Sequence, residues 1–564
     1  MEALDWLVIG VFFLALIGII VWVVRQKQND SADYFLGGRD ATWLAIGASI
    51  FASNIGSEHL IGLAGAGASS GMAMAHWEIQ GWMILILGWV FVPFYTRSMV
   101  YTMPEFLERR YNPQSRTILS VISLVSYVLT KVAVTVYAGG LVFQQVFGIK
   151  ELWGIDFFWI AAIGLVVLTA LYTIFGGMKS VLYTSVLQTP ILLLGSLIIL
   201  VLGFKELGGW DEMMRVCGAV TVNDYGDTMT NLIRSNDDAN FPWLGALIGS
   251  AIIGFWYWCT DQFIVQRVLS GKNEMEARRG TIFGAYLKLL PVFLFLIPGM
   301  IAFALHQKYI GAGGEGFLPM LENGTANADA AFPTLVAKLL PAGVKGLVVC
   351  GILAALMSSL ASLFNSSAML FTIDFYKRFK PETPEKKLVG IGQIATIVIV
   401  VLGILWIPIM RSVGDVLYTY LQDVQSVLAP GIAAAFLLGI CWKRTSAQGG
   451  MWGLISGMVI GLTRLGAKVY YSNAGEVADS TFKYLFYDMN WLFFCGWMFL
   501  FCIIVVIVVS LATEAPTAEK IQGLVFGTAT KEQKASTRAS WNHWDIIHTV
   551  IILAITAAFY WYFW

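Results

Sequence analysis

The chain has 564 residues, of which 57% are hydrophobic and only 13% are charged, and its mean hydropathy is +0.71. Soluble domains carry about 25% charged residues, so this composition argues against a soluble globular protein and for one integral-membrane domain. The net charge is zero, so a nucleic-acid partner is not expected. The six cysteines lie mostly within apolar runs and lack paired spacing, which argues against a disulfide framework or a zinc site.

The first apolar run, residues 6–24, has acidic residues before it and basic residues after it. Glu2 and Asp5 precede the run, while Arg25, Lys27 and Arg39 follow it. This order is opposite to that of a signal peptide. The positive-inside rule therefore predicts a retained membrane anchor whose N-terminus faces outside.

Apolar runs long enough to cross a bilayer recur along the whole chain. We expect about fourteen spans, at residues 5–24, 38–66, 77–97, 117–142, 156–174, 179–203, 242–266, 279–306, 341–375, 387–409, 415–441, 446–467, 488–512 and 543–562. Lys and Arg concentrate in the loops that this topology places inside, and an even number of spans returns the C-terminus to the outside. The sequence thus predicts an all-α polytopic protein of the cell (plasma) membrane, with the bilayer as a partner and both termini outside.

The second span contains polar side chains near its middle. Asn54, Glu58 and His59 lie there with Gly56 between them, although one charge at the centre of a span costs about 2.5–3.5 kcal/mol on insertion scales. Glycines at positions 56 and 62 weaken the helix locally. A break would free backbone carbonyls for a ligand, as in transporters with discontinuous helices. The alternative is a kinked helix whose polar groups are satisfied by neighbouring helices.

Further polar residues interrupt other spans. They are Glu78 with Trp77 and Gln80, Lys131, the stretch 254–262, Lys288, and Gln422 with Asp423 and Gln425. A single buried charge is often half of a structural ion pair, and we interpret Lys131 and Asp423 in this way, without assigned partners. As a set, the amide, carboxylate, imidazole and ammonium groups beside flat aromatic faces suit a ring with many hydroxyls, such as a sugar or a cyclitol.

The ninth span contains closely spaced serines. Residues 354–365 read Ala-Ala-Leu-Met-Ser-Ser-Leu-Ala-Ser-Leu-Phe-Asn. Such serines commonly bond back to their own helix, and small residues permit tight helix packing. Two adjacent hydroxyls facing a broken helix would also supply the neutral oxygens that a sodium ion requires.

At these residues the sequence resembles the solute:sodium symporter family, within it the sodium/glucose cotransporters, from about residue 6 to residue 512. The stretches that carry the resemblance are 52–59 (Ala-Ser-Asn-Ile-Gly-Ser-Glu-His), 101–111, 172–178, 256–262 (Trp-Tyr-Trp-Cys-Thr-Asp-Gln), 266–269, 286–289 and 357–365. Each is weak alone, but their order and spacing together are specific.

The resemblance implies the 5+5 inverted-repeat fold of leucine-transporter-type proteins, with core helices 1 and 6 broken. The first repeat would span residues 38–203 and the second 242–441, with an extra N-terminal helix at 5–24 and extra C-terminal helices at 446–562. The family's sodium ligands would fall on Ala52, Ile55, Ala355, Ser358 and Ser359. Its sugar contacts would fall on Asn54, His59, Glu78, Tyr257, Trp258, Lys288 and Gln422, and its gates on Leu63, Trp77, Tyr257 and Tyr418.

The sequence departs from the family pattern at three positions. Ser185 stands where sugar transporters of this family usually carry an aspartate associated with a second cation, so we expect one sodium per solute. Gly254 and Thr419 also replace polar residues of some relatives. The expected activity is sodium-driven import of a hexose such as glucose or galactose, or of a cyclitol such as myo-inositol. The alternatives are symport of an organic acid, amino acid or vitamin, and a sodium-dependent sensor or leak channel; an enzyme is not expected.

Overall fold

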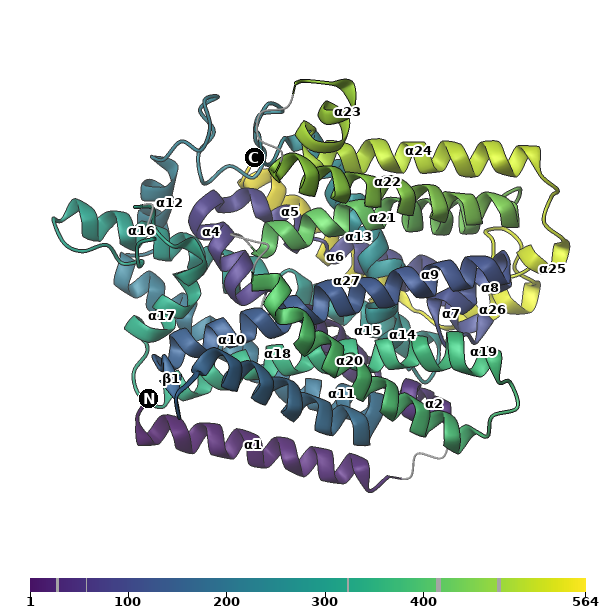
Figure 1. Cartoon of the computed structure of the whole chain (residues 1–564), viewed down its shortest axis with the longest axis horizontal. Coiled ribbons are helices and arrows are strands. Elements are labelled where there is room, and N and C mark those ends of the chain that lie inside the picture. Colours follow the sequence, from purple (N-terminus) through teal and green to yellow (C-terminus); the bar gives the residue numbers. More distant parts are fainter. Residues whose placement is uncertain (27–29, 57, 322–323, 412–416, 474–477) are drawn as a thin grey trace.

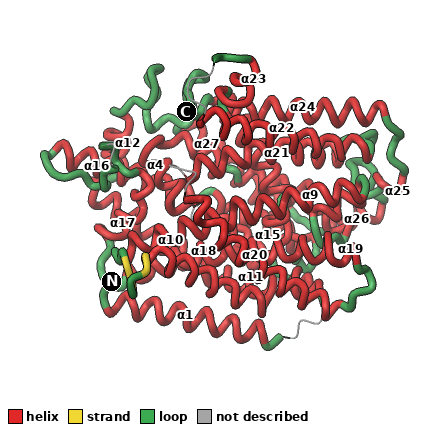
Figure 2. Tube along the Cα trace, in the orientation of Figure 1, coloured by secondary structure: helices red, strands yellow, loops and turns green. Residues whose placement is uncertain are grey.

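A computed structural model gives the structure of the chain, and it describes all residues except 27–29, 57, 322–323, 412–416 and 474–477. Most of the described chain is helical, with loops joining the helices (Figure 2). Short 3-10 and π-helical segments, labelled η, join or interrupt many of the α-helices. The strands that the described residues form are one two-residue pair, β1 (Glu151–Leu152) and β2 (Ile155–Asp156), in an antiparallel hairpin.

The helical segments before residue 208 are α1 (Ala3–Val24), α2 (Ser31–Leu36), η1 (Gly37–Arg39), α3 (Trp43–Asn54), η2 (Glu58–Leu63), α4 (Ala64–Ser70), η3 (Gly71–Met74), α5 (Ala75–Glu78), α6 (Gly81–Ile86), η4 (Leu87–Phe91), α7 (Val92–Ser98), α8 (Met103–Arg110), α9 (Pro113–Ser126), η5 (Tyr127–Val132), α10 (Ala133–Phe147) and α11 (Phe157–Leu207).

The later segments are α12 (Trp210–Gly218), α13 (Trp243–Gly254), η6 (Phe255–Thr260), α14 (Gln262–Leu269), α15 (Glu274–Lys288), η7 (Val292–Leu296), α16 (Ile297–Gly311), η8 (Ala328–Ala330), α17 (Ala331–Leu339), α18 (Val344–Met369), η9 (Leu370–Tyr376), α19 (Lys377–Phe379), α20 (Glu385–Arg411), α21 (Leu417–Cys441), α22 (Ala447–Asn473), α23 (Thr481–Lys483), η10 (Tyr484–Asp488), α24 (Trp491–Ala512), α25 (Ala518–Ile521), α26 (Lys531–Ala539) and α27 (His543–Tyr562).

Most of the long helices run side by side, with α1 along one edge of the molecule and α24 along the opposite edge (Figure 1). Among the described residues, ten helical segments are long and apolar enough to cross a membrane. Their surfaces remain apolar where they face outward: only 22% of the α1 window and 17% of the α27 window are buried. The exposed apolar side chains of these helices fit contact with lipid rather than water.

The element α11 joins two of the spans expected from the sequence. Its 51 residues would extend about 76 Å as one straight helix, far more than a bilayer is thick. Gly177 interrupts the helical dihedrals with a φ of 52°, and a Cβ at this position would lie 2.4 Å from the carbonyl oxygen of Tyr34. A glycine is therefore required where the chain turns between residues 157–176 and 178–207.

Small residues bring α3 and α15 into close contact in the interior. A Cβ at Gly47 would lie 2.8 Å from the carbonyl oxygen of Gly280, and a Cβ at Gly280 would lie 3.2 Å from that of Trp43. Helices without side chains at the crossing point can approach closely and gain packing contacts. This packing holds α3, which carries Asn54 at its end, against α15, which carries Lys288.

Candidate functional site

The helix α3 ends at Asn54, and the next helical segment, η2, begins at Glu58. Ile55 is extended, with φ −80° and ψ 110°. Its carbonyl oxygen is therefore released from the helical hydrogen-bond ladder. The Ser359 hydroxyl on α18 donates to the carbonyl oxygens of Ile55 at 2.9 Å and Ser53 at 3.0 Å. Residue 57 lies outside the described part of the chain.

The five residues expected to bind sodium are all buried. Ala52, Ile55 and Ala355 have at most 1% of their surface exposed, and Ser358 and Ser359 have 1% and 2%. The hydrogen bonds directly join Ile55 to Ser359, while the Ser358 hydroxyl lies 3.3 Å from that of Ser185. The structure thus gathers neutral oxygens of α3, α18 and α11 in one buried place, which is the donor chemistry that a hard monovalent cation prefers.

A polar cavity lies beside this point. Its lining includes all seven residues expected to contact the sugar and is formed by Asn54, Glu58, His59, Trp77, Glu78, Gln80, Ile253, Gly254, Tyr257, Trp258, Lys288, Gln422 and Gln425. The volume is about 50 Å³, which accommodates one or two water molecules. A hexose therefore requires that the lining move apart from this conformation.

A chain of polar contacts crosses the cavity. Lys288 Nζ lies 2.5 Å from Glu78 Oε2, and His59 Nε2 lies 3.4 Å from the same oxygen. Asn54 Nδ2 lies 3.3 Å from His59 Nε2. Because the side chains of Glu78 and Lys288 are 2% and 4% exposed, each charge depends on the other for compensation.

Three polar side-chain atoms of the lining lack a hydrogen-bond partner among the described residues. They are His59 Nδ1, Trp77 Nε1 and Gln422 Oε1, and all three are buried. Buried polar atoms in folded proteins nearly always have partners, so an unpaired donor or acceptor in a cavity wall requires an explanation. A hydroxyl-rich solute could supply all three missing partners, since a hydroxyl both donates and accepts.

Aromatic rings form the remaining walls. Tyr257 packs edge-on against Trp258 with centroids 4.9 Å apart, and the Lys288 ammonium lies 5.3 Å from the Trp258 ring. Trp77 stacks on Trp491 of α24 at 5.5 Å. Of the expected gate residues, Trp77 and Tyr257 line the cavity, whereas Leu63 is buried but is not part of its wall. The side chain of Tyr418 lies outside the described residues.

The polar residues Glu58, Gln80 and Gln425, which are not among the seven expected sugar contacts, also line the cavity. Gln425 follows Gln422 by three residues on α21, and this helical spacing places both on one face. Gln80 occupies the space beside Gly254: a Cβ at position 254 would lie 2.4 Å from Gln80 Oε1. The sequence singles out both glutamines as polar residues within apolar spans, but only the structure places them in this lining.

The two charges interpreted as structural do have partners. Lys131 Nζ lies 2.5 Å from Asp261 Oδ2, and rings of Tyr127 and Tyr257 lie 4.9 Å and 4.8 Å from the same ammonium. Asp423 forms an ion pair with Lys468. These contacts agree with the structural interpretation of both residues.

These features define a class of protein: a polytopic helical membrane protein with a buried polar cavity beside a cluster of neutral oxygens. The sodium:solute symporter family model matches residues 34–457, and the chain belongs to this family. It is therefore a sodium-coupled symporter, with sodium as the co-transported ion, and the family consists of transporters.

Named relatives cover most of the chain. The sodium/myo-inositol cotransporter 2 of Mus musculus is 37% identical over 94% of this chain and 80% of its own length. The sodium/glucose cotransporter 4 of Danio rerio is 35% identical over 96% of this chain and 84% of its own length. A sodium-coupled sialic acid symporter, solved in a substrate-bound outward-open state, has a TM-score of 0.72 at 21% identity, covering 92% of this chain and 99% of that one. This last likeness shows a shared fold.

Proposed function

We propose that this chain imports a sugar or a cyclitol together with one sodium ion by alternating access. The supporting observation is the cavity lining, in which unpaired buried atoms of His59 and Gln422 lie beside the Glu78–Lys288 pair and the faces of Trp258 and Tyr257. Hydroxyl groups can donate to and accept from all of these polar groups, and sugar C–H faces pack on aromatic rings. Relatives named for myo-inositol and for glucose agree with this solute class.

The proposed architecture has fourteen spans, two inverted repeats at 38–203 and 242–441, and interruptions after Asn54 and around Thr260. The extended residue Ile55 and the end of η6 at Thr260 support both interruptions. We place the protein in the plasma membrane with both termini outside, as the distribution of Lys and Arg predicts.

Sodium would bind between the Ile55 carbonyl oxygen and the Ser359 hydroxyl oxygen, in place of the hydrogen bond that now joins them. Its ligands would come from Ala52, Ile55, Ala355, Ser358 and Ser359. The ion would hold the segment after α3 against α18 and thereby orient Asn54 and His59 for the solute. By thermodynamic linkage, bound solute raises the affinity for sodium by the same factor by which bound sodium raises the affinity for the solute.

The proposed stoichiometry rests on Ser185. Its hydroxyl donates to the carbonyl oxygen of Val181 at 2.6 Å and lies beside Ser358, so it offers a neutral oxygen where a carboxylate would attract a second cation. One ion driven by about 100 mV and a tenfold gradient has about 3.7 kcal/mol available, which supports roughly 500-fold accumulation of a neutral solute.

Uptake into proteoliposomes tests the proposal. Labelled myo-inositol, glucose, galactose, proline and acetate are each supplied with an inward sodium gradient, and with choline in place of sodium as the control. We expect sodium-dependent accumulation of at least one polyol or sugar and none of proline or acetate. Sodium entry without solute accumulation would indicate a leak channel, and accumulation of proline or acetate would indicate another solute class; either result contradicts the proposal.

A further inference from the structure

A second, apolar groove lies outside the cavity, between α9 and the segment that ends the α18 span. It has a volume of about 430 Å³ and is lined by Leu124, Phe371, Phe375, Tyr376, Phe379 and Lys380. Phe371 is 42% exposed and Phe379 is 80% exposed. The candidate membrane span ends at Phe379, so the groove lies where the span leaves the apolar layer. The distribution of Lys and Arg predicts that this end faces the cytoplasm.

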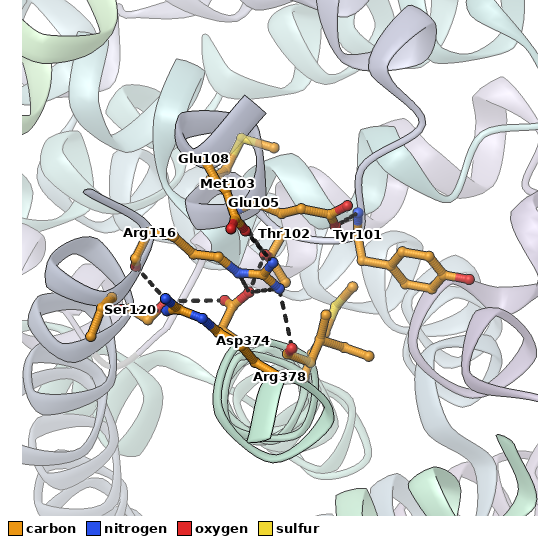
Figure 3. A network of polar contacts seen from close by, with 12 residues as sticks. Tyr101, Thr102, Met103, Glu105, Glu108, Arg116, Ser120, Asp374 and Arg378 are labelled. Atoms are coloured by element: carbon orange, nitrogen blue, oxygen red, sulfur yellow. Dashed lines mark hydrogen bonds and ion pairs between the residues drawn. The ribbon is translucent and has the colours of Figure 1, made fainter. Parts of the chain in front are cut away.

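The wall of this groove is held in place from behind. Figure 3 shows Asp374, which is on η9, bonded to side chains of two other elements. Its carboxylate accepts hydrogen bonds from Thr102 at 2.8 Å, Arg116 at 2.8 Å and Ser120 at 3.1 Å. Arg116 also donates to the carbonyl oxygen of Ile373 at 3.1 Å. These bonds fix the rotation of η9 and α9, so the groove is formed in advance of any ligand.

The outward face of η9 carries the aromatic side chains. Phe371 and Phe375 stack with centroids 6.4 Å apart and an interplanar angle of 27°. Because they lie one helical turn apart, the two rings make a continuous apolar strip along the segment. An extended hydrocarbon chain fits such a strip, since its contacts are apolar and need no directional partner.

The mouth of the groove carries a free positive charge. Lys377 pairs with Glu385 at 3.0 Å, and Arg378 donates to the hydroxyl of Thr117 at 2.5 Å. Lys380 is exposed, and within the described part of the chain no carboxylate pairs with its ammonium, which lies 5.9 Å from the Tyr376 ring. The apolar strip and the unpaired ammonium together match a molecule with a long hydrocarbon tail and an anionic head.

We propose that this groove binds a phospholipid with an acidic headgroup, its acyl chain on Phe371 and Phe375 and its phosphate on Lys380. Acidic phospholipids are concentrated in the cytoplasmic leaflet, and a basic residue near the surface attracts them. The groove is lined by a narrow set of side chains with one cation at its end, which suits a lipid better than the broad apolar face that a second copy of the chain would bury.

Native mass spectrometry of the purified full chain tests this proposal. The protein is titrated with phosphatidylglycerol, with phosphatidylcholine of the same acyl chains, and with soluble glycerol phosphate. We expect tighter binding of phosphatidylglycerol than of phosphatidylcholine and no binding of glycerol phosphate. Lys380→Gln should weaken the binding of the first phosphatidylglycerol molecule by about fivefold, which is the effect of one basic residue near a membrane surface.

The matched control is Lys386→Gln, which removes an exposed charge at the start of α20, outside the groove lining. Lys386→Gln should leave the tighter binding of phosphatidylglycerol unchanged, and Phe371→Ser should weaken the binding of both lipids. Melting in lipid-free detergent checks that the exposed-site variants remain folded. Equal affinity for the two lipids, equal effects of both lysine variants, binding of glycerol phosphate alone, or a dimer that excludes lipid would each overturn the proposal.

Discussion

Replacing one member of the Glu78–Lys288 pair should destabilise the protein strongly. The two charges lie 2.5 Å apart, with side chains 2% and 4% exposed. Glu78→Gln or Lys288→Met leaves the other charge buried without its close ion-pair partner, which costs about 3–5 kcal/mol. The double variant Glu78→Gln/Lys288→Met removes both charges and should recover most of that loss.

Equilibrium unfolding by sodium dodecyl sulfate in mixed micelles measures all four states of this double-mutant cycle. The matched control is Arg215→Gln: its partner Glu212 is on the surface and Arg215 is 71% exposed, so no measurable change is expected. Solute uptake should be lost in the single variants and in the stable double variant, since the cavity then lacks both charged contacts. Additive losses in the cycle would refute the buried pair, and normal uptake by the double variant would refute its role in binding.

Three further predictions concern single sites. Ser359→Ala should raise the sodium concentration for half-maximal uptake about tenfold or more, since a hydrogen-bonding group on a charge contributes about 1.5–3 kcal/mol. The control Ser366→Ala, on the same helix but bonded to Gln266, should leave this sodium concentration unchanged. Gln422→Ala should raise the solute KM about two- to tenfold at saturating sodium with unchanged membrane insertion, and an unchanged KM would contradict its contact with solute. Burial raises the pKa of Asp329 to about 6, so its charge opposes folding above that pH; Asp329→Asn should raise the melting temperature at pH 7.5, by an amount that shrinks toward pH 4.

The sequence predicted much of the cavity because polar side chains in apolar spans are costly. Asn54, Glu78, Lys288 and Gln422 come from four separate spans, yet all line one cavity. A bilayer provides no solvent for such groups, so they must face the protein interior and tend to converge there. The membrane environment therefore supplied the constraint that a soluble protein would lack.

Pairings between distant residues could not be predicted in the same way. Lys131 and Asp261 are 130 residues apart, and nothing in either local pattern identifies the other. The same holds for Asp423 and Lys468, and for the Ser53 carbonyl that accepts from Ser359. Such contacts depend on how helices are rotated and placed, and periodicity indicates which face is buried but not which helix covers it.

Gln80 and a side chain at position 254 would compete for the same space, and this has a consequence for how the solute selectivity of the family could change. The Gln80 carboxamide fills the volume that a side chain at position 254 would need, and it is anchored by the carbonyl oxygen of Ser250 at 2.8 Å. A polar group can thus reach the same part of the cavity from either of two helices. Substitutions at these two positions should therefore be correlated, with a bulky residue tolerated at only one of them. A change of solute selectivity in this part of the cavity would then require both residues to change together.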